Sequence, residues 1–583
     1  MANMQQFLNQ SSKLDLLVLL GKIIVIVFAS SYLLGNFVPF YEGNDSYTLA
    51  TIAMKISNGE YVDTNELLQK TGNIEFIPGD WSLSLDGKHT FPLGPIGYHF
   101  FTGMFYSLGN NFALFYLGPL IGILFLITSE RVATKLFNKN VGFLTLLFLA
   151  TNHLFYRSAS HLQVDVIFSL FFILGCYFLV TFLKTPSSAK IFISSLFFVL
   201  ATLMRINGII VFPIEIIIFT IFFILNKKSF SFYNFKKIHI SQKSFSLILI
   251  SMIIPWIAFF SFYFGYNETF FDDPFTNYAV QQRGYENTDA KTESLLLIEE
   301  KHYENIKQYS KYLLPYQFPA IESSTFSQLN NILGTFWIGL VALGILFLGL
   351  GISFKQKQHR KTLIIFVLMI LGTLWFFASV TSEDRAQQGV PGRYVMPAFT
   401  LFYMIIGFLL VSSFQKSLKF KNSKFLLGKT YRISLILVLG IFFSGSLFFI
   451  PPTELIKTNS FEFKNPYEFI ENHPPLLEGL DENNVILAIK TDRILEYDVI
   501  PFHMIPFERG GTEDSIILLK DVILDGYDVF VFKQPTTSLE KSMLSNLTEK
   551  HGFIFKDYSS SFCKVSLMDE RNLENSDSVC LKN

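Results

Sequence analysis

The chain has 583 residues, of which 50% are apolar and 16% are charged, and it carries 67 phenylalanines. A soluble protein has about 25% charged residues. Together with a mean hydropathy of +0.38, the apolar excess predicts a surface that faces a lipid bilayer. The 47 basic and 47 acidic residues leave no net charge, which argues against a nucleic-acid-binding protein. Three cysteines are too few for a disulfide scaffold or a cysteine-rich metal site.

Apolar runs long enough to cross a bilayer, which takes about 20 residues, recur along the first 450 residues. The sequence predicts about eleven spans, at 14–36, 112–130, 141–156, 165–183, 190–204, 208–225, 245–265, 331–353, 362–380, 394–414 and 433–450. The apolar segment 95–108 is short, so we expect a re-entrant or surface helix there. No small-residue cleavage site follows the first run, which predicts a retained span.

Lysine and arginine gather in alternate loops, which contain almost no carboxylates. These loops are 131–139, 184–190, 227–243, 355–361 and 416–432. The positive-inside rule places them in the cytoplasm together with the N-terminus. The other loops then face outward, at 37–111, 157–164, 205–207, 266–330, 381–393 and after 451. The chain is therefore expected to be a multi-pass protein of the cell membrane.

The sequence pattern changes after the last span, which predicts two domains, 1–450 in the membrane and 451–583 outside it. Strand-like runs at 485–489, 528–532 and 553–555 alternate with helical patterns at 515–524 and 539–550. This alternation predicts a small extracytoplasmic α/β domain, expected to be a structural or acceptor-docking cap. Cys563 and Cys580 are placed where they could pair, whereas Cys176 lies in an apolar run.

Asp45 is the first candidate for chemistry, because it lies just past the outer end of the first span in Gly43-Asn44-Asp45-Ser46-Tyr47. A carboxylate at the water–lipid boundary is suited to act as a general base toward an acceptor hydroxyl or to bind a divalent cation. The alternative is an N-cap for a short helix over 47–57.

Asp165 is the second candidate, at the outer edge of a span. If the segment is helical, Arg157, His161 and Asp165 share one helix face, each about one turn from the next. An ionisable group at the edge of a span is costly unless it is paired or functional. An Arg157–Asp165 pair is the structural alternative, and His161 is more readily explained as a hydrogen-bonding residue than as a metal ligand.

Several cations lie on the predicted outer side, where the positive-inside rule makes them uncommon. They are Lys88 and His89, Arg205, and Arg393. Arginine at a membrane mouth suits a lipid phosphate, because its planar fork matches phosphate oxygens. The alternative is pairing with carboxylates of the outer loops, such as Glu383 or Asp384.

The loop 266–330 mixes aromatic and acidic residues, among them Glu268, in a composition that suits sugars but is also common in wet interfacial loops. It contains a glycosylation acceptor pattern, Asn267-Glu268-Thr269. Two spans carry a charge in mid-run, Lys22 and Glu215, and either could belong to an ion path.

The order of these motifs resembles the C-type glycosyltransferases, which use polyprenyl-phosphate-linked sugars, and most of all their protein O-mannosyltransferase and aminoarabinose transferase-like group. The resemblance covers about residues 14–450. It is carried by Asp45-Ser46-Tyr47 with Ala50 and Asn58-Gly59, Pro92-Leu93-Gly94-Pro95, Lys135-Leu136-Phe137, Arg157 to Asp165, Arg205 with Asn207-Gly208, and Arg393-Tyr394 with Pro397.

The resemblance implies a role for each matching position. Asp45 corresponds to the family's catalytic base, and Asp165 to a second acid that assists or binds a metal. Lys88 and Arg393 correspond to donor-phosphate ligands. Two positions depart from the pattern, because Ser46 replaces a second acid and Lys88 precedes the first proline by four residues. These departures weaken a metal site and the phosphate role of Lys88.

The implied activity is transfer of a sugar from a polyprenyl-phosphate donor to a hydroxyl or amide of a protein, lipid or glycan, with inversion. Asp45 acts as base, and Lys88, Arg205 and Arg393 bind the donor phosphate. Weaker substrate contacts are expected from Tyr47, His161, Glu268 and Tyr394, and a divalent metal ion would involve Asp45 and Asp165. A transporter or flippase for lipid-linked glycans is the main alternative, and a membrane scaffold presenting the α/β tail is another.

Overall fold

The computed structural model describes residues 2–37, 43–59, 61, 81–83, 90–92, 96–227, 242–271, 274, 344, 359–380, 395–419, 484–488, 503–506, 513–532, 538–558 and 562–567. The chain forms two compact units. The first unit contains Met1–Phe37, Gly118–Phe264 and Asp289–Leu455, and the second contains Val38–Leu117, Gly265–Thr288 and Ile456–Asn583.

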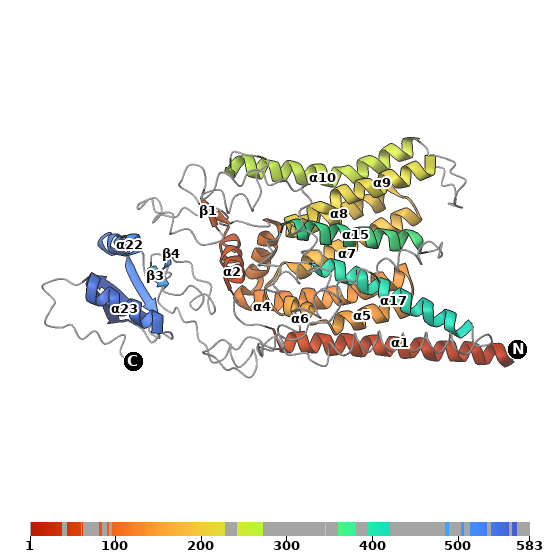
Figure 1. Cartoon of the computed structure of the whole chain (residues 1–583), viewed down its shortest axis with the longest axis horizontal. Helices are drawn as coiled ribbons and strands as arrows, with labels where there is room; N and C mark the ends of the chain where they lie inside the picture. Colours follow the sequence, from red (N-terminus) through yellow and green to blue (C-terminus); the bar gives the residue numbers. More distant parts are fainter. Residues whose placement is uncertain are drawn as a thin grey trace. The chain divides into compact units, whose positions relative to one another are not determined.

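The first unit is a bundle of apolar helices that run roughly side by side in Figure 1. Its helices are α1 (Ala2–Gly35), the later part of α4 (Ile96–Leu136), α5 (Lys139–Ala150), α6 (His153–Ala159), α7 (Asp165–Lys184), α8 (Ser188–Met204), the 3₁₀ turn η2 (Ile206–Ile210), α9 (Val211–Lys227), most of α10 (Gln242–Phe271), α15 (Arg360–Val380) and α17 (Met396–Lys419). Helix α7 packs against α8, and α17 packs against α5, α7 and α15.

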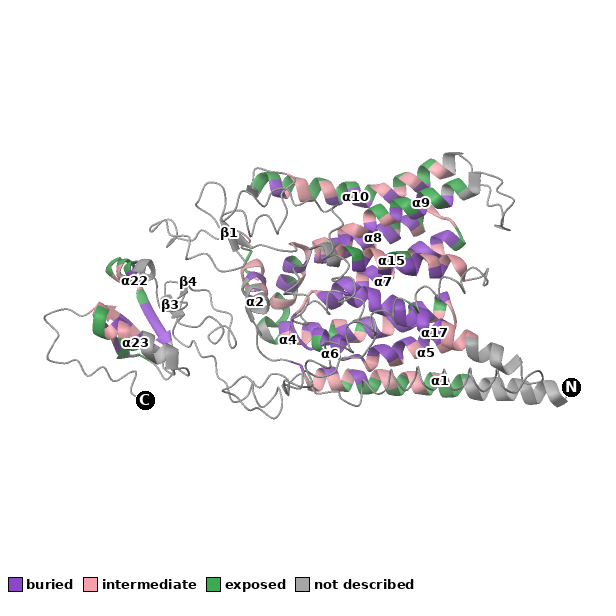
Figure 2. Cartoon of the chain, viewed as in Figure 1, coloured by how far each residue is buried: buried purple, intermediate pink, exposed green. Residues whose placement is uncertain are grey.

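Burial differs sharply between helices of this bundle (Figure 2). Helices α7 and α17 are mostly buried. Helix α1 instead exposes large apolar side chains between Leu16 and Phe28, with Leu17 at 64% and Phe28 at 68% exposure. Contiguous apolar surface of this kind is unfavourable in water but suits lipid, so α1 is a lipid-facing helix.

Four described helices are long and apolar enough to cross a bilayer: Asp15–Gly35, Phe112–Leu136, Asp165–Lys184 and Phe245–Thr269. They match four of the predicted spans. Shorter apolar helices occupy the runs near 190–204, 208–225 and 394–414, and α15 occupies 362–380. The predicted spans 331–353 and 433–450 lie outside the described residues, apart from Gly344. The count of about eleven spans therefore stays a prediction.

The predicted span 141–156 is wrong as a single helix, because the chain breaks between α5 and α6. Asn152 causes the break: its side-chain oxygen accepts from Phe155 N at 3.0 Å and so starts α6. Its amide nitrogen donates to the Tyr403 hydroxyl at 2.5 Å. An apolar run alone does not reveal this, since the decisive partner is distant in the sequence.

The second unit begins with α2 (Gly43–Ser57), the hairpin β1 (Trp81–Leu83) and β2 (Thr90–Pro92), and the first arm of α4. The arm confirms that the segment 95–108 is helical, and its re-entrant or surface placement stays a prediction. It ends at a kink where Gly109 and Asn110 leave helical geometry. A Cβ on Gly103 would lie 2.5 Å from Ile56 Cγ2, so the missing side chain lets α2 pack closely on this arm.

The second unit also contains a five-stranded sheet near the C-terminus. Its strands are β3 (Asn484–Ala488), β4 (His503–Pro506), β5 (Asp528–Phe532), β6 (Phe553–Asp557) and β7 (Phe562–Leu567), in the order β4-β3-β5-β7-β6, with α22 (Glu513–Leu524) and α23 (Ser538–His551). The sequence identified three strands and both helices but missed β4 and β7. Strand β4 pairs in parallel with β3, and β7 lies between β5 and β6 and pairs antiparallel with both.

Apolar residues of both helices and the sheet form one core, which includes Leu519, Val529, Leu547 and Phe553. Cys563 lies in this core and is disulfide-bonded, whereas Cys176 is free and buried. Cys580, the predicted partner of Cys563, lies outside the described residues. The division of the chain at residue 451 stays a prediction.

Candidate functional site

One end of the first unit gathers lysines against helix carbonyls, and we call it the lysine end. Lys361 donates to the Leu183 carbonyl at 2.8 Å, and Lys184 donates to the Leu136 carbonyl at 3.3 Å. These are last-turn carbonyls of α7 and α4, which lack partners in their own helices and carry negative helix-dipole charge. Lys139 pairs with Asp15 of α1. Loops predicted to share one side of the membrane therefore meet at one end of the bundle.

His359 lies at the lysine end between two phenylalanine rings. Its ring centroid is 5.4 Å from that of Phe137 and 5.1 Å from that of Phe408. Burial is the main cause that lowers the pKa of His359 below its ordinary value, and the positive charge of Lys184 lowers it further. The imidazole is therefore neutral near pH 7.

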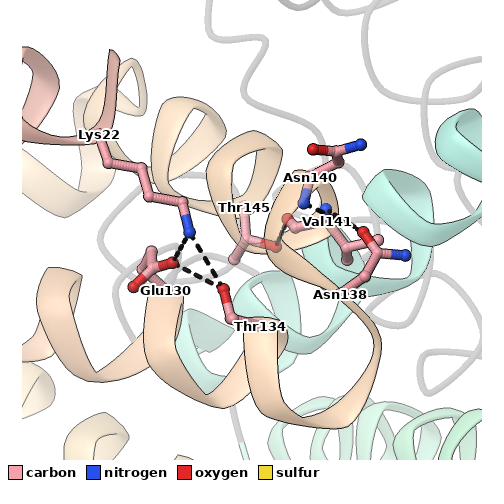
Figure 3. A network of polar contacts seen from close by, with 7 residues as sticks. All are labelled: Lys22, Glu130, Thr134, Asn138, Asn140, Val141 and Thr145. Carbon is pink, nitrogen blue, oxygen red and sulfur yellow. Dashed lines mark hydrogen bonds and ion pairs between the residues drawn. The ribbon is translucent and has the colours of Figure 1, made fainter. Parts of the chain in front are cut away.

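A polar network crosses between α1 and α4 within the bundle (Figure 3). Lys22 extends from α1, forms an ion pair with Glu130 and donates to the Thr134 hydroxyl at 3.3 Å. Thr134 in turn donates to Glu130 at 2.7 Å. A Cβ on Gly142 would lie 2.0 Å from the Thr134 hydroxyl oxygen, so α5 closes over the network because that residue is glycine. The network gives Lys22 a structural role and does not require an ion path.

The opposite end of the bundle brings together two residues predicted for the site, and we call it the Asp165 end. Asp165 forms an ion pair with Arg205. The Asp165 side chain is 2% exposed and that of Arg205 is 16% exposed, so the carboxylate lies behind the guanidinium. Asp165 starts α7 and Arg205 caps the end of α8. Each charge therefore complements the dipole of its own helix as well as its partner.

A tight turn presents Arg205 between α8 and η2. The Arg205 carbonyl accepts from Gly208 N at 2.8 Å. A Cβ on Gly208 would lie 2.9 Å from Thr202 Cα, so a larger residue would force the turn open. The motif Arg205 with Asn207-Gly208 thus has a mechanical explanation: the glycine allows the turn that places the arginine.

The segment before Asp165 departs from the helix that was expected over 157–165. Helix α6 ends at Ala159, and α7 starts at Asp165 after a turn. His161 is buried, and its Nδ1 donates to the Arg157 carbonyl at 2.7 Å, which closes this turn. Arg157 is exposed, and Asp165 pairs with Arg205. The shared helix face and the Arg157–Asp165 pair are both wrong, because the chain turns between them.

Helix α4 supports the same turn through two glycines that sequence reasoning did not single out. A Cβ on Gly118 would lie 2.4 Å from the His161 carbonyl oxygen, and one on Gly122 would lie 2.7 Å from the Ala159 Cβ. Glycines four residues apart are a known signature of close helix contact in membranes. This spacing is the signal by which the sequence would have revealed the contact.

The other predicted site residues are described less fully. Lys88, Arg393 and Tyr394 lie outside the described residues. Asp45 and Tyr47 lie in α2, and only their backbone is described. Since α2 starts at Gly43, Asp45 lies in the first helical turn, and the helix expected over 47–57 begins earlier than predicted. The structure therefore brings together Asp165 and Arg205 and leaves the remaining assignments as predictions.

Loop 266–330 starts later than predicted, because α10 continues to Phe271. Tyr266 lies on this extension, and its hydroxyl is 3.3 Å from that of Tyr61. Glu268 is exposed. Asn267 is buried, and its amide donates to the Pro274 carbonyl at 3.2 Å, so the glycosylation pattern is not accessible in this conformation.

The described residues do not fit a metal site. Within that part of the chain, no group of three His, Cys, Asp or Glu residues could hold an ion. The carboxylate of Asp165 is ion-paired with Arg205, which competes with a cation. We therefore assign no step to a metal.

The fold is that of a polytopic integral membrane protein. Residues 93–258 match the family model for dolichyl-phosphate-mannose-protein mannosyltransferases. This segment includes Asp165 and Arg205 and excludes Asp45, Lys88 and Arg393. The match confirms the resemblance to the O-mannosyltransferase and aminoarabinose transferase-like C-type glycosyltransferases. No curated protein sequence matches the chain significantly.

Solved structures resemble the chain at low sequence identity. The archaeal oligosaccharyltransferase AglB from Archaeoglobus fulgidus, in complex with an inhibitory peptide and a dolichol-phosphate, is 12% identical with a TM-score of 0.50. The alignment covers 94% of this chain and 74% of that one. ArnT from Cupriavidus metallidurans bound to undecaprenyl phosphate is 12% identical with a TM-score of 0.47, over 95% of this chain and 98% of that one.

Proposed function

We propose that this protein is a membrane glycosyltransferase that moves a sugar from a polyprenyl-phosphate donor to an acceptor hydroxyl or amide on the outer side of the membrane. The observation that carries the proposal is the Asp165–Arg205 pair, which lies at one end of the bundle inside the segment that matches the mannosyltransferase model. The fold shared with an oligosaccharyltransferase supports the same class of reaction.

Arg205 is suited to bind the donor phosphate. A guanidinium has five N–H donors in a rigid fork, more than one carboxylate can accept, so a paired arginine can also serve phosphate oxygens. Asp165 assists by holding the fork in one orientation, because its own side chain is buried behind it. Donors fixed in advance stabilise charge that develops in the transition state without reorganising.

The reaction is a single displacement at the anomeric carbon. The acceptor atom forms a bond to that carbon from the face opposite the phosphate, while the carbon–oxygen bond to the phosphate breaks. The bonding electron pair leaves with the phosphate oxygen, where Arg205, Arg393 and Lys88 compensate the charge. Asp45 takes the acceptor's proton. Attack from the opposite face inverts the anomeric configuration.

Two features support the outer location of this chemistry. The lysine end corresponds to the cytoplasmic side by the positive-inside rule, and the Asp165 end lies at the other ends of the same helices. The disulfide at Cys563 suits an oxidising compartment, as expected for a tail outside the cytoplasm.

The test is transfer by the purified full-length protein in proteoliposomes. Polyprenyl-phosphate sugars with labelled mannose or aminoarabinose are supplied with a membrane extract as acceptor, and both new glycosides and free polyprenyl phosphate are measured. We expect transfer by the wild type and a loss of about 100-fold or more for Asp45→Asn, as for removal of an essential base. Equal transfer by the two proteins would remove Asp45 from the mechanism.

The same vesicles test the transporter alternative. A flippase would move the labelled lipid between leaflets without breaking the sugar–phosphate bond, and its movement would not depend on acceptor. That outcome would overturn the transferase proposal.

Orientation is tested with single cysteines in intact cells. Thr185 lies in the turn after α7, and Arg157 lies near the Asp165 end; both are exposed. A membrane-impermeant maleimide is expected to label Arg157→Cys from outside and Thr185→Cys only after permeabilisation. The reverse pattern would place the Asp165–Arg205 pair in the cytoplasm. Buried Cys176 is the internal control.

A further inference from the structure

Glu215 is a fully buried carboxyl group whose partners are all uncharged. It lies in α9 at 0% exposure. Its Oε1 is 2.9 Å from the Ser195 hydroxyl and 3.4 Å from that of Ser194. Trp256 Nε1 of α10 donates to Oε2 at 2.9 Å. Among the described residues, no lysine, arginine or histidine forms an ion pair with it. Glu130, which is also buried in the bundle, is by contrast paired with Lys22.

The two serine hydroxyls are compatible with an uncharged Glu215, because a hydroxyl can either donate to its Oε1 or accept from it. Each hydroxyl has one hydrogen and two acceptors within reach. Ser195 Oγ is also 3.1 Å from the Ile191 carbonyl, and Ser194 Oγ is 3.0 Å from the Gly175 carbonyl. If the hydroxyls donate to these carbonyls, a protonated Oε1 supplies the hydrogen for Ser195, and every group is satisfied. An unpaired charge at this depth would be far more costly.

The Glu215 cluster lies deeper in the bundle than the Asp165–Arg205 pair, farther along the same helices. Ser195 is ten residues before Arg205, and Glu215 is ten residues after it, so their hydrogen bond joins the two arms of the α8–α9 hairpin. Gly175, ten residues after Asp165, joins this cluster because its carbonyl accepts from the Ser194 hydroxyl. Ten helical residues span about 15 Å. Helices α7 and α8, which carry Asp165 and Arg205 at their ends, are thus tied to each other and to α9 deeper in the bundle.

Tight packing supports this tie. A Cβ on Gly175 would lie 2.5 Å from the Phe198 ring, so α7 and α8 touch closely beside Ser194. The Phe212 and Trp256 ring centroids are 4.9 Å apart, which joins α9 to α10. The turn at Gly208 fixes the tip of the hairpin, but a tip alone does not set how the two arms align along their length.

We propose that Glu215 is a positioning residue, an uncharged hydrogen-bonded clamp that sets the register of α7, α8 and α9 and so holds Arg205 against Asp165. Only the expected effect on catalysis rests on the proposed function, whereas the packing role of Glu215 does not. A shift of one residue along a helix moves its end by about 1.5 Å. Misplacement by about 1 Å is enough to cost roughly 100-fold in rate.

The first experiment measures transfer by the full-length protein with Gln or Leu at position 215. Glutamine keeps the shape, accepts from Trp256 and donates to the serines, so Glu215→Gln should stay within about threefold of wild type. Glu215→Leu should raise the KM for the donor and lower kcat/KM by about 10- to 100-fold. Equal losses in both variants would show that charge is required and would overturn the clamp.

A double-mutant cycle separates positioning from general stability. With Arg205→Gln already in place, Glu215→Leu should lower kcat/KM by less than threefold further, because the residue it positions is gone. A full additional loss would overturn the proposal. Thr373→Val is the matched control: Thr373 is buried in α15 and donates only to the Met369 carbonyl of its own helix among the contacts described, at 2.7 Å.

A second readout does not depend on transferase activity. Asp165→Asn, Arg205→Gln and the double variant are each made in three backgrounds, with Glu, Gln or Leu at position 215. Thermal denaturation of each set gives the free energy of coupling between Asp165 and Arg205 in that background. The coupling should persist with Glu and Gln and vanish with Leu. Coupling that survives Leu would overturn the clamp. Coupling that vanishes, in a protein without transferase activity, would support the clamp and reject the proposed function.

Discussion

The two ends of the helical bundle in the first unit neutralise charge in different ways. At the lysine end, Lys184 and Lys361 donate to helix carbonyls, so each cation completes the end of a neighbouring helix. At the Asp165 end, Asp165 and Arg205 neutralise each other, with the carboxylate buried and the guanidinium partly exposed. The first arrangement is spread over several elements. The second concentrates two opposite charges in one pair, which under the proposed function binds the donor phosphate.

This difference shows how the same residue types acquire structural or functional roles. A cation that caps a carbonyl uses its charge within the fold, and its loss should be felt mainly as stability. A cation held by a buried carboxylate is oriented in advance for a second anion, and its loss should be felt mainly as activity. Substitutions at the two ends test this contrast directly.

The largest effect is expected from Arg205→Gln at the Asp165 end. Loss of one transition-state anion ligand should lower kcat for sugar transfer by about 100- to 1,000-fold. Lys361→Gln at the lysine end is the matched cation control and should stay within threefold. Transfer rates in proteoliposomes provide the measurement. If the two variants lose similar activity, the contrast between the ends fails.

Glu130→Gln should cause the largest loss of stability. It leaves Lys22 without its counter-charge in a mostly buried place, which costs about 3 kcal/mol. The double variant Lys22→Met with Glu130→Gln should recover most of this loss, because no unpaired charge remains. Thermal denaturation in detergent measures both. A double variant as unstable as the single one would show that packing, and not charge, dominates this network.

Gly118→Ala should affect the Asp165 end through packing alone. The added methyl group meets the His161 carbonyl oxygen at 2.4 Å, so the turn before Asp165 must shift. The strain is about 1–3 kcal/mol, with transfer reduced about tenfold if roughly 1.4 kcal/mol of it raises the reaction barrier. Gly35→Ala is the control, since a Cβ there has no neighbour within 4 Å. Unchanged activity in Gly118→Ala would mean that the turn adapts without moving Asp165.

Lys361→Met at the lysine end should have a modest effect. It removes one cap from the last turn of α7, which contributes about 0.5–1 kcal/mol. The thermal midpoint should fall slightly while kcat stays unchanged. A large fall in kcat with a normal midpoint would contradict a purely structural role for this end.

The smallest expected effect is a pH dependence of stability from His359. Because its pKa is lowered in the folded protein, the unfolded chain binds a proton below about pH 6.5 that the folded chain does not. Stability should therefore fall as pH drops through that range. His359→Asn should show a shallower dependence between pH 7 and 5 in thermal denaturation. An identical slope in both proteins would assign the effect to other groups.

Composition and periodicity predicted much of this architecture. Apolar runs closely identified the part of α1 that can cross a bilayer, as well as α7 and α15, because a bilayer-crossing helix is a local property of about 20 residues. The lysine pattern predicted which turns share one side, and their contacts at the lysine end agree with it. The α/β character of the tail was likewise visible in the alternation of short strands and helices.

Only the tertiary structure decided which charges meet. Sequence spacing favoured Arg157 as the partner of Asp165, yet the partner is Arg205, forty positions away. Lys22 and Glu215 look alike in the sequence, as single charges in apolar runs. In the structure Lys22 pairs with a carboxylate, whereas Glu215 has only uncharged hydrogen-bond partners. Local pattern reports how a segment folds, because it depends on neighbours in the chain. The partner of a buried charge depends on helix packing, which brings together residues that the sequence leaves far apart.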